Sequence, residues 1–151
     1  MIFRSPYADI DVPDTSLSSF VLAGAAARGD KPALIDGPTG RTITYAQLAG
    51  GVQRLAGGLA QRGLKKGDVF AIFSPNVPEY ALAFHGIATA GGVSTTLNSL
   101  YTVDEITFQL NDSKARFLLT IPQFLDRAQE AAAKCDVEEI FVLGEAEGAT
   151  P

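Results

Sequence analysis

The residues best placed for chemistry form a turn between an apolar strand and a helix. The apolar run Val69–Phe73 is followed by the turn Ser74–Glu79, and a helix N-terminus at such a place offers free amides to an anion. However, Pro75 and Pro78 have no amide hydrogen to donate, and Glu79 puts a negative charge where a phosphate would lie. We therefore expect a rigid, capped turn here rather than a phosphate site.

The two glycine-rich signatures of nucleotide binding are missing from the sequence. No predicted strand is followed by the G-x-G-x-x-G fingerprint of dinucleotide-binding folds. The P-loop requires a lysine directly after a glycine, and no lysine of this chain stands in that context. A nucleotide site of either kind is therefore not predicted from these residues.

The chain has a single histidine, His85, and a single cysteine, Cys135, which excludes an internal disulfide and a cysteine-rich zinc site. His85 lies on a predicted helix between Phe84 and Gly86. We expect it to be a packing or surface histidine, with a position beside a substrate path as the alternative. Cys135 ends a predicted helix with Lys134 as its basic neighbour, which favours a structural or exposed thiol over a nucleophile.

Adjacent acidic residues occur at Asp104-Glu105 and at Glu138-Glu139. Neighbouring side chains on a helix or strand point in different directions, so neither pair can share one proton-transfer site. We expect Glu105 to cap a helix instead.

Small residues repeat seven positions apart in one predicted helix, at Gly50, Gly51, Gly57 and Gly58. This stripe favours the close approach of another backbone, and a weak helix is the alternative. Neither interpretation adds a reactive group. The residues alone therefore predict no catalytic, cofactor-binding or metal-ligating residue in this chain.

Length and composition limit the class of protein. With 151 residues, 46% of them hydrophobic and 19% charged, the chain can form one domain with a buried core and is not intrinsically disordered. A net charge of −5 with scattered basic residues argues against nucleic-acid binding. The first residues do not resemble a secretory signal, and the apolar stretch 81–93 is too short to span a bilayer. We expect a soluble, cytoplasmic protein.

The elements that would position these residues alternate between strands and helices. A hairpin is expected from residues 33–35 and 41–44, which flank a turn-rich loop. The apolar pattern then predicts helices over 44–62, 76–90 and 120–134, a further helix from residue 102, and strands over 69–73, 93–97, 116–120 and 139–143. Such alternation favours parallel pairing with right-handed crossovers. We predict an α/β fold with a mostly parallel sheet and a short β-hairpin near the N-terminus.

Helix starts are predicted from pairs of polar residues three positions apart. A short first helix is expected from Ser16 to Gly29, with Leu17, Phe20 and Val21 on its apolar face. The later helices should be capped by four pairs: Thr44 with Gln47, Asn76 with Glu79, Thr102 with Glu105, and Thr120 with Gln123.

The predicted organisation is an N-terminal arm over residues 1–16 and an α/β subdomain over residues 17–151. No helix is predicted after the last strand, where the sequence ends in the loop-like Gly148–Pro151. A parallel sheet normally has both faces covered. We therefore expect a domain that is incomplete at its C-terminus, with an exposed sheet edge and face that would need the remainder of its own chain or a dimer mate.

Three segments together resemble the N-terminal part of the adenylate-forming superfamily, which contains acyl-CoA synthetases and luciferases. Arg41–Leu48 is similar to the family's TYxEL-like motif, with Gln47 where glutamate is common. Lys66–Asn76 resembles its GDvVai strand and the turn after it. Gly91–Ile106 is similar to an N-P-x-Y-T-x-x-E segment typical of 4-coumarate–CoA ligases and related acid ligases, with Ser99 in place of the usual proline.

The resemblance implies a ligase that works in two steps. A carboxylic acid attacks the α-phosphate of ATP to give an acyl-adenylate and pyrophosphate, and coenzyme A then displaces AMP to give a thioester. ATP, Mg²⁺ and coenzyme A would be its cofactors and a small-molecule carboxylic acid its substrate. The family's phosphate loop, nucleotide contacts, acid pocket and catalytic lysine all come later than these motifs, so no catalytic residue is carried over and the chain alone is expected to be inactive.

Two other functions remain open at this point. One is a truncated, non-catalytic member of the same family that works as an interaction or scaffold module. The other is a flavodoxin-like domain that binds a ligand at the carboxyl ends of its strands.

Overall fold

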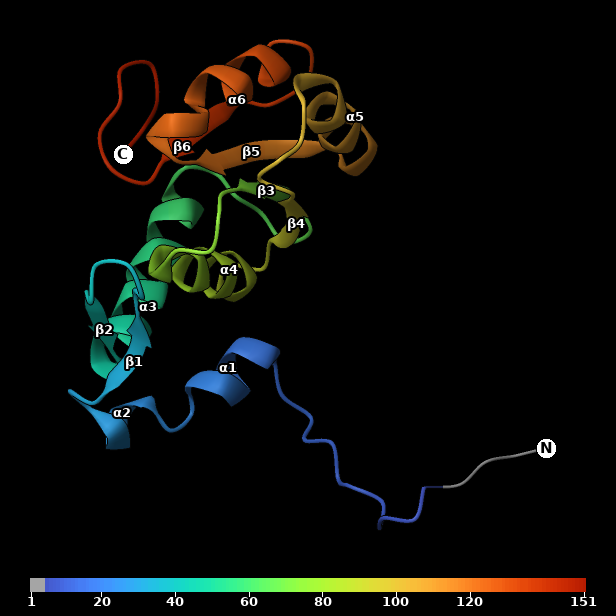
Figure 1. Cartoon of the computed structure of the whole chain (residues 1–151). Helices are drawn as coiled ribbons and strands as arrows, with labels where there is room; N and C mark the ends of the chain where they lie inside the picture. The colour runs from blue at the N-terminus through green and yellow to red at the C-terminus, as the bar shows by residue number, and fades with distance from the viewer. Residues whose placement is uncertain (1–4) are drawn as a thin grey trace.

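A computed structural model describes residues 5–151 and contains a parallel sheet between two layers of helices (Figure 1). The helices are α1 (Leu17–Leu22), α2 (Ala25–Arg28), α3 (Tyr45–Gln61), α4 (Pro78–Thr89), α5 (Val103–Ser113) and α6 (Leu125–Ala132), with a 3-10 turn η1 (Pro122–Phe124). The strands are β1 (Pro32–Ile35), β2 (Thr42–Thr44), β3 (Val69–Phe73), β4 (Val93–Leu97), β5 (Ala115–Thr120) and β6 (Glu139–Val142). The first four residues of the predicted arm lie outside the described residues.

The main sheet has the strand order β4-β3-β5-β6, and all of its pairs are parallel. Strand β3 is central and its last four residues are buried, as its uninterrupted apolar sequence predicts. The strands end in register, with Phe73 level with both Leu97 and Thr120. The predicted α/β fold with a mostly parallel sheet is therefore confirmed.

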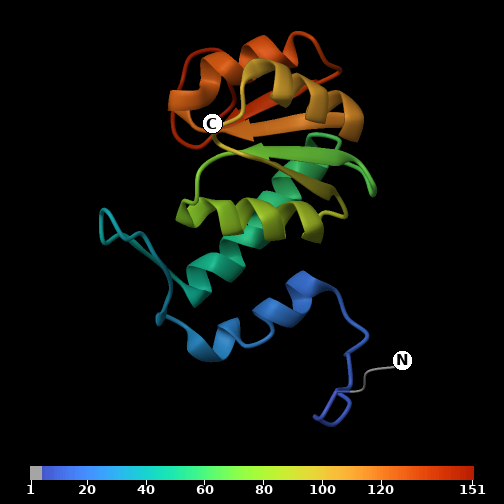
Figure 2. The same cartoon turned by 45° about the vertical axis from the view of Figure 1, so that its right-hand side comes forward.

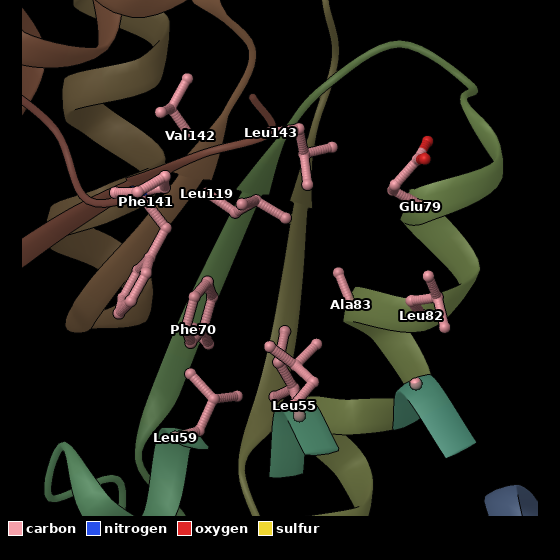
Figure 3. Close-up of a pocket in the computed structure, with 13 residues that line it drawn as sticks. Leu55, Leu59, Phe70, Glu79, Leu82, Ala83, Leu119, Phe141, Val142 and Leu143 are labelled. Carbon is pink, nitrogen blue, oxygen red and sulfur yellow. The ribbon is translucent and has the colours of Figure 1, made fainter. Parts of the chain in front are cut away.

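Each face of the sheet carries two helices, α3 and α4 on one side and α5 and α6 on the other (Figure 2). The core on the α5–α6 side is centred on Phe73, Ile106 and Leu118, all of which are fully buried. The core on the α3–α4 side includes Phe70 and Ile87. Both faces of the sheet therefore carry helices, and the expected uncovered face is limited to the part of the α3–α4 side where an apolar groove stays open (Figure 3).

The predicted hairpin is confirmed by the antiparallel pair β1–β2 near the N-terminus. Its strands flank a loop in which the Thr39 hydroxyl donates to the Asp36 carboxylate and Gly40 has a φ of +72°. Helix α3 begins directly after β2. There Thr44 and Gln47 form the predicted capping box, with each side chain bonding the other's backbone amide.

The first helix differs from its prediction in length and in orientation. It is broken into α1 and α2, although Ser16 caps its start as predicted. The one buried residue of α1 is Ser18, whose hydroxyl lies 3.0 Å from His85 Nδ1 on α4. The predicted apolar face is instead exposed to solvent: Leu17, Phe20 and Val21.

Two of the four predicted caps are wrong. Helix α4 is preceded by Val77, which makes no side-chain cap, and starts with Pro78, so Asn76 and Glu79 do not form a pair. Thr120 does not cap α6, because it is still part of β5. Its side chain is fully buried, and its hydroxyl donates to the Phe73 carbonyl at 3.0 Å.

The residues that follow β6 fold back along its outer edge. The amide of Val142 donates to the Thr150 carbonyl at 2.7 Å, and the Thr150 amide donates to the Ile140 carbonyl at 2.9 Å. This isolated parallel bridge, which places Thr150 beside Phe141, occupies part of the sheet edge that the sequence predicts to be exposed.

Candidate functional site

The loops that follow the parallel strands gather at one edge of the sheet, where α/β proteins commonly bind ligands. The loop after β3 leads to α4 on one face, whereas the loop after the adjacent β5 leads to η1 and α6 on the other. Two open hollows lie here. One, of about 530 Å³, lies between Arg41, Glu79 and Gln123; the other, of about 580 Å³, lies between Asn76 and Asn98. This edge is the candidate functional site.

An ion pair closes the α4 side of the first hollow. Arg41, beside β2, binds both carboxylate oxygens of Glu79 in the first turn of α4, with Nη2 and Oε2 2.8 Å apart. These hydrogen bonds lower the pKa of Glu79 below its ordinary value, so its carboxylate stays ionised. The turn after β3 therefore presents a neutralised ion pair to the hollow. The pair spans 38 positions, and no local signal in the sequence indicates it.

The turn after β4 is held by its own hydrogen bonds. Asn98 Oδ1 accepts a bond from the Leu100 amide at 3.0 Å, and the Tyr101 amide donates to the Asn98 carbonyl at 3.0 Å. Thr102 and Glu105 then form the predicted capping box at the start of α5. Hydrogen bonds from Thr102 lower the pKa of Glu105. The polar residues of this segment thus shape a turn and begin a helix.

Arg127 on α6 is another residue at this edge that the sequence pattern did not indicate. Its guanidinium donates to the carbonyls of Tyr101 at 2.8 Å and Ser99 at 3.3 Å. The same group lies over the rings of Phe73, at 5.1 Å from the centroid, and Phe124, at 4.6 Å. Arg127 therefore connects the turn after β4 to the core. It lies 26 and 28 positions from Tyr101 and Ser99 in the sequence, so local spacing does not indicate these contacts.

The two single residues with reactive side chains have structural partners. His85 faces Ser18 of α1, and partial burial lowers its pKa, which favours the neutral imidazole. The Cys135 thiol donates to the Ala131 carbonyl at 3.2 Å, and burial raises its pKa, which disfavours the thiolate. Neither residue lines the two hollows at the carboxyl edge.

The adjacent carboxylates diverge, as expected. Glu138 binds Arg116 through two hydrogen bonds of 2.8 and 2.7 Å, and these lower its pKa, whereas Glu139 pairs with Arg62. Within residues 5–151, no group of three or more histidine, cysteine, aspartate or glutamate side chains could hold a metal ion.

The glycine stripe is only partly a packing contact. A Cβ on Gly51 would lie 2.6 Å from Leu82 Cδ2 of α4, so that position does permit close approach, whereas Gly57 and Gly58 face open space. The glycine that completes the α3–α4 contact is Gly86, where a Cβ would lie 2.7 Å from Leu55 Cδ2. Gly86 lies on the partner helix, which is why a stripe read along α3 alone does not include it.

No helix in the described part of the chain is long and apolar enough to cross a membrane.

Comparison with known proteins identifies what this arrangement resembles. The AMP-binding enzyme family matches residues 22–149. The chain is 34% identical over 143 residues to 4-coumarate–CoA ligase 1 of Petroselinum crispum, covering 94% of this chain and 26% of that protein. It is 36% identical over 149 residues to 4-coumarate–CoA ligase 3 of Oryza sativa subsp. japonica, covering 98% of this chain and 27% of that protein. The chain thus spans about a quarter of the length of these relatives.

Solved structures confirm the fold. A long-chain-fatty-acid–CoA ligase from Archaeoglobus fulgidus superposes with a TM-score of 0.87 at 22% identity, over 97% of this chain and 31% of that one. An anthranilate CoA ligase in complex with anthranoyl-AMP superposes with a TM-score of 0.84 at 24% identity, over 93% of this chain and 27% of that one.

Proposed function

Because the chain belongs to the AMP-binding enzyme family, we propose that it is the N-terminal part of an ATP-dependent acid–CoA ligase of the 4-coumarate or fatty-acid type. The observation that carries this proposal is the identity of 34% and 36%, over nearly the whole chain, to two plant 4-coumarate–CoA ligases. The complete protein would join a carboxylic acid to AMP with release of pyrophosphate, and would then transfer the acyl group to coenzyme A.

In this proposal the chain supplies a scaffold and the rest of the ligase supplies the chemistry. Residues 17–151 form the N-terminal α/β subdomain and residues 1–16 its arm, and none of them is a catalytic, cofactor-binding or metal-binding residue. Supporting this, Glu79 and Glu138 are engaged by arginines, and Arg127 is engaged by backbone carbonyls. ATP, Mg²⁺, coenzyme A and the acid would be held by residues outside this chain, and a cytoplasmic location fits its single cysteine.

Acid-dependent exchange of pyrophosphate into ATP tests the proposal. The complete protein from its native source should catalyse exchange with at least one of 4-coumarate, a medium-chain and a long-chain fatty acid. The 151-residue chain should catalyse none. A complete protein that shows no exchange with any of these acids would overturn the assignment, and exchange by the 151-residue chain would overturn the claim that the chain alone is inactive.

A second candidate is a non-catalytic interaction module of the same family. The observation that favours it is an apolar groove on the α3–α4 side of the sheet, which offers a surface to another polypeptide. The two candidates differ in the mass of the native polypeptide, since an interaction module would be present as a chain of 15.9 kDa.

A further inference from the structure

Strand β4 forms one edge of the parallel sheet (Figure 1). Among residues 5–151, β3 is the single strand that pairs with it. The Val93 amide donates to the Asp68 carbonyl at 2.8 Å, so the backbone of Val93 faces β3. The backbone groups of successive residues in a strand point alternately to its two sides. Ser94 and Thr96 therefore direct their amides and carbonyls away from β3, toward the open edge.

Strand β4 lacks the features that commonly protect the edge of a sheet. Such edges are protected by charged side chains, by proline or by a bulge. The sequence Val-Ser-Thr-Thr-Leu of β4 has no charged residue and no proline, and its register with β3 is uninterrupted. A second copy of β4 laid antiparallel along this edge would place no like charges opposite each other within the strands. Ser94 of one copy and Thr96 of the other would exchange backbone hydrogen bonds.

The side chain of Gln109 occupies the position that a second strand would need. Gln109 lies on α5, and its amide nitrogen donates to the Thr96 carbonyl at 3.0 Å and to the Thr95 hydroxyl at 2.8 Å. The Thr96 carbonyl is one of the outward groups of the edge, so an incoming N–H would have to displace this amide. Both acceptors belong to β4, so pairing with a second strand would break two hydrogen bonds between the helix and the edge.

We propose that Gln109 is an edge lock, a side chain that keeps β4 unpaired and so prevents the chain from associating with a second copy through this strand. The role goes beyond the proposed function, because it concerns the assembly of the protein and no step of the ligase reaction. It depends on the N–H groups of the Gln109 amide, because a side chain without a donor cannot bond the Thr96 carbonyl.

The mass of Gln109→Met in solution tests the edge lock. Methionine keeps the length and helix propensity of glutamine but has no hydrogen-bond donor. Gln53→Met is the matched control, since Gln53 is an exposed residue on helix α3. Sedimentation equilibrium is carried out on the 151-residue chain in about 0.3 M salt, which screens repulsion between the acidic side chains of two copies. Asp104 and Asp112 lie beside Gln109 and are the acidic residues concerned.

Gln109→Met should have twice the mass of the wild-type species, because pairing of two identical edges closes at a dimer. Gln53→Met should have the wild-type mass. Thr96→Lys, added to Gln109→Met, places a charge on the edge and should restore the wild-type mass. An unchanged mass for Gln109→Met would overturn the proposal, as would a doubled mass that Thr96→Lys does not reverse.

Gln109→Asn provides a second test that does not depend on the folding of Gln109→Met. It keeps an amide but is one methylene too short to reach Thr96, so its mass should double as well. A Gln109→Asn chain that is folded by circular dichroism and has the wild-type mass would overturn the edge lock. The proposal would also be wrong if Thr96→Lys alone halved the mass of the wild type, because β4 would then already be paired.

Discussion

Replacement of Gly86 by alanine tests the close packing of α3 against α4. A Cβ on Gly86 would lie 2.7, 3.0 and 3.1 Å from Cδ2, Cγ and Cβ of Leu55. Rotation of the leucine side chain cannot relieve a contact with its own Cβ, so the two helices must move apart. Overpacking of this kind costs about 1–3 kcal/mol, against a gain of about 1 kcal/mol in helix propensity. We expect Gly86→Ala to lower the free energy of unfolding by about 1 kcal/mol.

Gly57→Ala is the matched control, because Gly57 lies on α3, is exposed and has nothing within 4 Å of the position that a Cβ would take. This substitution should raise the free energy of unfolding by about 0.5–1 kcal/mol. Urea unfolding followed by circular dichroism measures both, and the midpoints should move in opposite directions by roughly 0.5 M. The packing argument is refuted if Gly86→Ala stabilises the protein as much as Gly57→Ala does.

Three further predictions follow from the contacts described above. Thr102→Ala should lower the free energy of unfolding in urea by about 1 kcal/mol, whereas Asn76→Ala should change it by less than about 0.5 kcal/mol; equal losses would contradict the cap assignments. Burial lowers the pKa of His85 in the folded state. The contribution of this neutral imidazole to the free energy of unfolding is therefore complete above the unfolded pKa of 6.5, and it is lost as the pH falls through the lower folded pKa. The urea midpoint should therefore fall less between pH 7.5 and 5.5 for His85→Asn than for the wild type, and parallel curves would contradict this. Since burial raises the pKa of Cys135, its thiol should react with a disulfide reagent at pH 8 more slowly in the folded than in the urea-unfolded chain, and equal rates would show that the thiol is not shielded.

Local signals predicted the elements of this fold well. The continuous apolar run of β3 and the capping boxes at Thr44 and Thr102 depend on residues within a few positions of one another. The same type of signal was wrong at Asn76, because Pro78 begins the helix and a distant arginine engages Glu79. It was wrong at Thr120, because the backbone is still extended there and the hydroxyl faces a neighbouring strand.

The candidate site was predicted less completely, because its contacts join residues far apart in the sequence. The Arg41–Glu79 pair and the Arg127 contacts appear only when the strands have assembled and their carboxyl ends meet at one edge. The inward orientation of Ser18 has the same origin. Apolar spacing on α1 favoured burial of Leu17, but the partner offered by α4 is the polar His85.

The intact mass of the native polypeptide tests the central claim most directly, namely that this chain is one part of a complete acid–CoA ligase. An antibody against residues 17–151, used with a denaturing gel and mass spectrometry, should detect a species about four times heavier than 15.9 kDa, since the chain spans 26% of the Petroselinum crispum ligase. A native species of 15.9 kDa would contradict the account and would identify the chain as a free-standing module.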